Sequence, residues 1–228
     1  MLPPTGDLRP GLSIYSILGV KMLHMHIFRF FVTSLSLLSS PALAGDLDLK
    51  IVDAAGKAVS DAVITVRPAG GVPSEPIRFP WGTSMVQQNI AFVPHVLIVP
   101  VGATVRFPNK DKVRHHIYSF SKPAKFEIKL FGQDESRSYT FTSAGAVALG
   151  CNIHDQMSGF IKVVDTPFAT KSNAAGQAHL GGLATGTAKM TVWHPLLKAK
   201  DNELVINVPI PPRGSATKTI TLALRSAR

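Results

Sequence analysis

The sequence contains one cysteine, Cys151, among 228 residues. A single thiol excludes a dinuclear electron-transfer copper centre, which needs two cysteines, and argues against structural zinc, which favours more than one thiolate. In an exported protein, an unpaired cysteine is either inert in a core or held by a bound group. The fate of Cys151 is therefore the question on which the function depends.

Acidic residues are few, with 14 against 24 basic residues and a formal charge of +10. The lysines and arginines are scattered and form no run interleaved with aromatic residues, so we expect no nucleic-acid partner. The sequence also lacks any pattern of a nucleophile with its base or of paired catalytic carboxylates, and we predict that the protein is not an enzyme. The basic charge favours an acidic protein partner.

The apolar segment near the N-terminus is too short to span a bilayer. Residues 28–38 supply about 11 positions where roughly 20 are needed. Residues 39–41 (Ser-Ser-Pro) and the small residues of 42–44 (Ala-Leu-Ala) follow. This order is typical of a secretory signal peptide. We predict that residues 1–44 are cleaved after Ala44, that no membrane span remains, and that the protein is periplasmic.

The first part of this leader has an unusual composition. Residues 1–21 contain several prolines and glycines and fit neither a signal n-region nor a folded core, so Met22 or Met25 is an alternative start. Residues 1–44 contribute +2 of the charge, which leaves +8 on the mature chain. The residue after Ala44 is a glycine, so nothing indicates a lipid anchor.

No stretch after residue 44 shows a sustained apolar repeat at three and four residues, and apolar residues alternate with period two instead. This pattern predicts an all-β protein with Gly, Pro, Asn and Asp in its turns. Strands are expected at residues 47–52, 62–67, 96–99, 104–107, 116–120, 125–130, 138–141, 146–150, 159–164, 189–193, 204–208 and 217–224.

Two short turn sequences far apart in the chain are alike. Residues 53–58 read DAAGKA and residues 173–178 read NAAGQA, so each places an acid or amide three residues before a glycine. The segments around them resemble the carboxypeptidase regulatory-like β-sandwich. We therefore predict that residues 45–80 and 166–228 form one discontinuous β-sandwich, with residues 70–80 as the linker that leaves it.

The middle of the chain carries the clearest candidate site. The sequence GCNIHDQM places Cys151, His154 and Met157 at spacings of three, directly after the strand expected at 146–150. One tight loop can then direct a thiolate, an imidazole and a thioether to the same point. Thiolate and thioether are soft ligands that favour copper. Each residue taken alone has a simpler explanation as core filler or turn residue, but their combination predicts a metal site.

A second histidine is needed to complete a two-His, one-Cys plane with a weak axial methionine, which is the ligand set of blue-copper electron-transfer sites. The upstream sequence FPNKDKVRHHIYSF offers His115 and His116. Residues 85–164 resemble the cupredoxins, of the plastocyanin and amicyanin kind, and the whole chain is similar to bacterial methylamine utilisation proteins of plastocyanin-like type. The resemblance implies a Greek-key β-sandwich over residues 81–165, inserted in or flanked by the second sandwich.

The resemblance does not decide between the two upstream histidines. In cupredoxins the ligand precedes an asparagine and an aliphatic residue, which makes His115 the ligand and puts His116 at the asparagine position. Against this, strand alternation places His116 on the face of Tyr118 and Phe120, which is more apolar than that of Ile117 and Ser119. The ligands predicted by the resemblance are His115, Cys151, His154 and Met157, with His116 as the alternative, and the residues expected to support them are His116, Asn109 and Asn152.

The resemblance implies a function for such a site. It would hold one type 1 copper ion and pass single electrons between redox proteins such as a cytochrome or a dehydrogenase, with His154 as the electron portal. Two alternatives are open: a periplasmic protein that binds or delivers copper without redox turnover, and a structural β-sandwich module that has lost its metal.

Overall fold

The structure, a computed structural model, describes residues 44–226. The predicted signal peptide, with its alternative starts Met22 and Met25, lies outside the described residues apart from Ala44. The described chain is all-β, as predicted, and its only helical element is the 3-10 turn η1 (Lys200–Asn202). None of the described residues forms a helix with the length and apolar character needed to cross a membrane.

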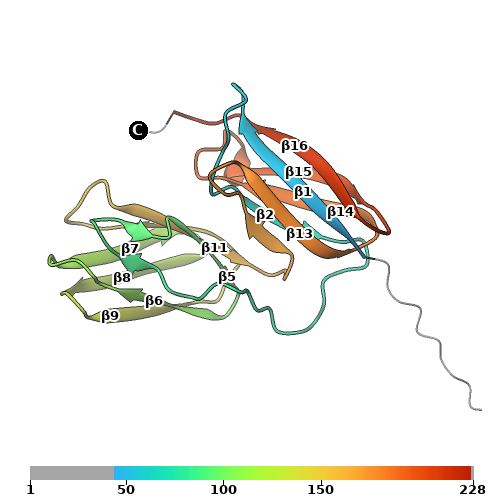
Figure 1. Ribbon diagram of the computed structural model, residues 1–228. Helices are drawn as coiled ribbons and strands as arrows, with labels where there is room; N and C mark the ends of the chain where they lie inside the picture. The colour runs from blue at the N-terminus through green and yellow to red at the C-terminus, as the bar shows by residue number, and fades with distance from the viewer. Residues whose placement is uncertain (1–43, 227–228) are drawn as a thin grey trace, which may run out of the picture. The chain divides into compact units, whose positions relative to one another are not determined.

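Strands from both ends of the described chain pair with one another. These flanking strands are β1 (Ala44–Asp53), β2 (Val63–Arg67), β12 (Ala169–Lys171), β13 (Gln177–Ala184), β14 (Gly186–Trp193), β15 (Glu203–Ile210) and β16 (Ser215–Leu222). They form a three-stranded sheet in the order β13-β1-β16 and a four-stranded sheet in the order β12-β2-β14-β15. Figure 1 shows β1 lying between β13 and β16, so the first described strand pairs with the last.

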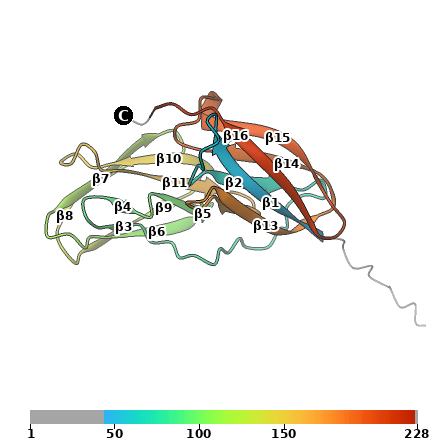
Figure 2. The same ribbon diagram turned by 45° about the horizontal axis from the view of Figure 1, so that its top comes forward.

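The strands between them form separate sheets. These middle strands are β3 (Val86–Gln87), β4 (Phe92–Val93), β5 (Val96–Pro100), β6 (Ala103–Pro108), β7 (His115–Ser121), β8 (Ala124–Phe131), β9 (Ser136–Phe141), β10 (Gly145–Gly150) and β11 (Ser158–Val164). The largest sheet has the order β5-β11-β10-β7-β8, and the pairs β3-β4 and β6-β9 complete the set (Figure 2). Within residues 44–226, no strand ladder joins a middle strand to a flanking strand.

The two similar turn sequences adopt the same local structure. Asp53 Oδ1 accepts the N–H groups of Ala55 and Lys57, each at 2.9 Å, and Asn173 Oδ1 accepts those of Ala175 and Gln177 at the same distance. The glycines that follow have φ of 79° at position 56 and 73° at position 176, which favours glycine in both turns. The Ile51 N–H donates to the Gly176 carbonyl at 2.7 Å, so the second turn contacts the strand that leads into the first.

Two main cores differ in composition. The core of the flanking strands is aliphatic, with residues such as Leu47, Ile64 and Leu183 that expose 1% of their surface or less. The core of the middle strands contains phenylalanines, Met85, Met157 and Cys151. The only sulfur-containing side chain in the first core is Met190, whereas the second core buries the thiol of Cys151 and the thioethers of Met85 and Met157. Cys151 directly follows β10.

Several short or glycine-containing strands were not predicted. β3, β4 and β12 span two or three residues, too few for a periodic pattern to be recognised. β13 contains Gly181 and Gly182, which have low strand propensity, and it places His179 in a strand where a turn would have been the simpler reading of the sequence. The expected strand at 217–224 is β16, which begins earlier and ends at Leu222.

Candidate metal centre

Three predicted ligands converge in the structure. The donor atoms of His115, Cys151 and His154 lie within 4.8 Å of one another. Cys151 Sγ lies 3.9 Å from His115 Nδ1 and 3.6 Å from His154 Nδ1. Donors bound to one ion at about 2.0–2.3 Å, in a trigonal arrangement, would lie about 3.5–3.7 Å apart. The two distances from Cys151 Sγ to the histidine nitrogens are therefore close to those of donors that share one metal ion.

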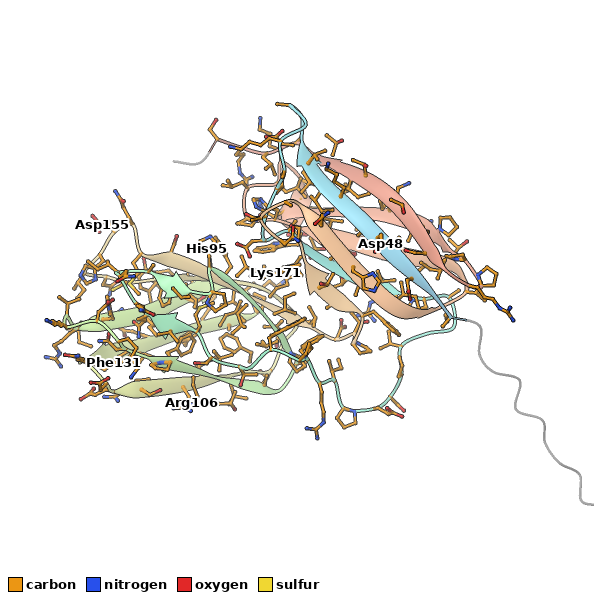
Figure 3. All side chains as sticks on the ribbon, in the orientation of Figure 1. Asp48, His95, Arg106, Phe131, Asp155 and Lys171 are labelled. Atoms are coloured by element: carbon orange, nitrogen blue, oxygen red, sulfur yellow. The ribbon has the colours of Figure 1, made fainter. Side chains whose placement is uncertain are left out.

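Cys151, His154 and Met157 all lie in one loop between the hydrogen-bonded strands β10 and β11. Cys151 follows the last residue of β10, and Met157 precedes the first residue of β11. The ends of the loop are fixed because Gly150 pairs with Ser158, and the Met157 N–H donates to the His154 carbonyl at 2.9 Å. Asp155 lies on the exposed outer part of this loop (Figure 3).

A side chain at position 150 would meet the ring of Tyr118. A Cβ atom there would lie 2.6 Å from Tyr118 Cζ and 2.7 Å from the Tyr118 hydroxyl. Tyr118 is the register partner of Gly150 on the neighbouring strand β7. The phenol ring thus occupies the space beside the residue that precedes Cys151, which restricts how the start of the ligand loop can move.

Met157 lies in the same core as the thiol. Its side chain is 2% exposed and Cys151 is 4% exposed, and both belong to the core of the middle strands. Both residues also line a cleft of about 500 Å³, together with Tyr118 and Asn152. The fourth predicted ligand is therefore buried on the side of the loop where the thiol lies.

The structure separates the two upstream histidines. His115 is fully buried and belongs to the cluster. His116 instead donates its Nε2–H to Glu127 Oε1 at 2.8 Å, and its ring is tilted against that of Tyr118 with 5.9 Å between the ring centroids. The greater apolarity of the face of Tyr118 and Phe120, which was the argument for His116 as the alternative ligand, does not mark the buried face of the strand. Ile117 and Ser119 face the core with exposures of 0% and 1%, whereas Phe120, on the face of His116, is 80% exposed.

Regular alternation along β7 accounts for this separation. His115, Ile117 and Ser119 lie two residues apart from one another, so they share one face of the strand, and this face is the buried one. The register between β7 and β8 also shifts here, since two steps along β7, from His115 to Ile117, pair with three steps along β8, from Phe131 to Ile128. The extra residue therefore lies in β8.

Asp111 contacts the outer nitrogen of His115. Its Oδ2 lies 2.8 Å from His115 Nε2, and its carboxylate also accepts the N–H groups of Asn89 at 2.7 Å and Ile90 at 3.0 Å. Partial burial acts to raise the pKa of Asp111, but the hydrogen bonds from Ile90, His115 and Asn89 together hold this pKa below its ordinary value. The carboxyl group is therefore ionised at neutral pH.

The residues expected to support the ligands differ in their contacts. Asn109 is fully buried, accepts the Asp111 N–H at 2.9 Å, and donates to the carbonyls of Val113 at 2.8 Å and Phe131 at 3.3 Å. Asn109 thus fixes the loop that leads to His115. Figure 3 labels Phe131, whose carbonyl accepts one of these hydrogen bonds. Asn152 is exposed on the ligand loop. His116 is buried, and within the described chain its Nδ1 has no hydrogen-bond partner.

Two further polar groups near the cluster, Asp111 and Gln87, were not among the residues expected to support the ligands. The contact between Asp111 and His115 has a local signal, since the two residues are four apart in the sequence. Gln87 has no such signal: it is fully buried beside Asn109, and among the described residues both polar atoms of its amide lack a partner.

The chain matches no family model and no curated protein. Among solved structures, it is similar to a purple cupredoxin from Nitrosopumilus maritimus, with 23% identity over 36% of this chain and 100% of that chain, and a TM-score of 0.34. It is similar to a mutant of amicyanin in its reduced form, with 22% identity over 44% of this chain and 98% of that chain, and a TM-score of 0.34. A third match is a copper-containing nitrite reductase from Thermus scotoductus SA-01, with 28% identity over 43% of this chain and 25% of that chain, and a TM-score of 0.35.

Two of these structures are of the cupredoxin kind that the sequence resembles. Because all three TM-scores lie below 0.5, the ligand assignment depends on the geometry of His115, Cys151 and His154 rather than on the matches.

Proposed function

We propose that the protein is a periplasmic electron carrier that holds one type 1 copper ion with His115, Cys151, His154 and Met157. The observation that carries the proposal is the convergence of two imidazole nitrogens and a thiol within 4.8 Å at the end of a buried core. One thiolate, two imidazoles and a thioether are the ligand set that selects copper over harder metal ions. When bound, the ion would accept or donate one electron as it changes between Cu(II) and Cu(I).

The protein's part in such an exchange is to keep the ligands fixed. Cys151 and Met157 are buried at the two ends of a loop whose flanking strands pair up to Gly150 and Ser158. His115 is fully buried and bound to Asp111. Ligands that cannot move favour rapid electron transfer, because little rearrangement accompanies the change in charge.

His154 is suited to the role of electron portal. It is half-buried, whereas His115 is fully buried, and its neighbour Ile153 is 50% exposed. An electron can therefore pass between His154 and a protein docked on this loop. The excess of basic over acidic residues in the chain would steer an acidic partner such as a cytochrome or a dehydrogenase.

We also propose the predicted domain division, with residues 45–80 and 166–228 as one discontinuous β-sandwich and residues 81–165 as the cupredoxin-like domain. The pairing of strands within each set supports it. A role for the protein in methylamine oxidation stays a prediction from the resemblance alone.

The proposal is tested by the visible spectrum after addition of one equivalent of Cu(II) to protein expressed with its own N-terminal segment. We expect an intense thiolate-to-copper absorption band that ascorbate bleaches and ferricyanide restores. Cys151→Ser should lose the band entirely, while His95→Ala, which removes an exposed histidine outside the cluster, should keep it. A colourless protein that still binds copper would favour the copper-handling alternative, and a protein that binds none would contradict both.

A further inference from the structure

Asp111 has contacts that go beyond those of a loop carboxylate. We propose that it is a positioning residue that holds His115 with Nδ1 toward Cys151 and makes this imidazole a stronger donor to Cu(II) than to Cu(I). The inference rests on the proposed copper function. Its two geometric observations are the 2.8 Å contact between Asp111 Oδ2 and His115 Nε2 and the 3.9 Å contact between His115 Nδ1 and Cys151 Sγ.

The contact with the carboxylate determines which nitrogen of His115 is available. An ionised carboxylate only accepts hydrogen bonds, so His115 Nε2 must carry the proton that it donates to Asp111. In the neutral ring the lone pair then lies on Nδ1, the atom that faces Cys151. Asp111 thus selects the tautomer that a metal ion beside the thiol needs.

Asp111 is itself fixed from two directions. Its carboxylate accepts the N–H groups of Asn89 and Ile90, and its own N–H donates to the buried Asn109 side chain at 2.9 Å. Asn89 and Ile90 have φ of 57° and 54°, and a β-branched residue such as Ile90 adopts this left-handed conformation rarely. The two turn amides and Asn109 therefore hold the carboxylate at the place where it meets His115.

The negative charge of Asp111 is not shared with a lysine or arginine. Among the ion pairs of residues 44–226, Asp111 pairs only with His115, while its neighbour Lys110 pairs with Asp134 at 2.9 Å. The Asp111 side chain is 13% exposed, so water screens its charge only in part. A carboxylate behind a ligating imidazole raises the basicity of the imidazole, and a stronger donor favours the more highly charged ion.

The test compares Asp111→Asn with Asp134→Asn, which removes the same charge from the neighbouring Lys110 pair without touching a proposed ligand. We expect Asp111→Asn to lower the affinity for Cu(II) about 10- to 100-fold and the affinity for Cu(I) less. Each tenfold difference between the two losses raises the reduction potential by about 59 mV. Asp134→Asn should leave both affinities and the potential near those of the wild type. Equal effects in the two variants would overturn the inference.

A second measurement needs no copper. Nitrogen NMR of the metal-free wild-type protein should show the His115 proton on Nε2, and Asp111→Ala should give a mixture of tautomers. A proton on Nδ1 in the wild type would overturn the positioning role. The visible band of the wild type separates the two levels of inference: its absence contradicts the proposed copper function, while the tautomer still decides whether Asp111 orients His115.

Discussion

The flanking and middle parts of the protein differ in whether the buried polar groups are hydrogen-bonded. In the flanking part, Thr166 donates to the Val66 carbonyl at 2.9 Å and Ser172 donates to the Val59 carbonyl at 2.7 Å. In the middle part, the Gln87 amide and His116 Nδ1 are buried without partners among the described residues. A buried polar atom without a partner costs about 1–3 kcal/mol.

Within residues 44–226, the buried polar atoms without partners lie in the middle part, so this part carries the local cost in stability. The flanking core is aliphatic, and the buried hydroxyls of Thr166 and Ser172 beside it are hydrogen-bonded, so these two groups carry no such cost. The middle part gathers His115, His116, Asn109 and Gln87 at the end of the sheet that carries Cys151. Local costs of this kind are expected at functional sites, and the surrounding structure has to offset them.

The largest effect that tests this comparison is the loss of a leucine from each core. Leu183→Ala removes a fully buried side chain of the flanking core and should lower the free energy of unfolding by about 2–5 kcal/mol. The visible band of the copper-loaded folded protein should be unchanged, because Leu183 belongs to the core without ligands. Chemical unfolding followed by circular dichroism, together with the visible spectrum, measures both quantities.

The matched variant is Leu149→Ala, in the middle core two residues before Cys151. It should cost a similar free energy of unfolding but also shift or weaken the visible band, because the cavity lies next to the ligand loop. If both leucine variants changed the band equally, the distinction between a core that supports the ligands and a core that does not would be wrong.

The parts of the site that the sequence predicted are those encoded locally. Cys151, His154 and Met157 lie in one loop, and their spacing indicates their convergence before any fold is known. The paired turns at Asp53 and Asn173 were recognisable for the same reason, because each acid or amide binds backbone groups two and four residues ahead.

The parts that the sequence did not predict depend on distant contacts. The choice between His115 and His116 depends on which face of β7 the rest of the fold covers, and the covered face is that of Ile117 and Ser119 rather than the more apolar face of Tyr118 and Phe120. The link from Asp111 to Asn89 and Ile90 joins residues 22 and 21 positions apart through a turn with two left-handed residues. No local pattern encodes such a contact, since neither residue of the turn is a glycine.

A smaller effect is expected from Gly150→Ala, which tests whether the middle part is tightly packed beside the ligand loop. The new Cβ would meet Tyr118 Cζ at 2.6 Å, so we expect a loss of about 1–3 kcal/mol in the free energy of unfolding. The double variant Gly150→Ala with Tyr118→Ala should lose less free energy of unfolding than the sum of the losses in the two single variants, because without the ring there is no clash. If the losses measured by urea unfolding simply add, the ring is free to move aside.

The smallest expected effect concerns His194, a buried histidine directly after β14 in the flanking part. Burial lowers the pKa of His194 below its ordinary value of 6.5, and His95 adds to this lowering, while Asp61 and the Ser60 backbone oppose it. Between the lowered pKa and 6.5, the unfolded chain binds more protons than the folded chain. Stability should therefore fall as the pH drops below about 6.5 through this window.

Two variants sharpen the prediction for His194. His194→Gln should remove this part of the pH dependence. His95→Gln should narrow the pH range between the pKa of folded His194 and 6.5, because the repulsion from His95 that helps to lower the pKa of His194 is lost. Urea midpoints measured at several pH values between about 5 and 7.5 would detect both changes. The copper band should not follow this titration, since His194 lies outside the cluster of His115, Cys151 and His154. A band that changed in step with the urea midpoint would mean that the flanking strands and the metal end respond to protonation as one unit.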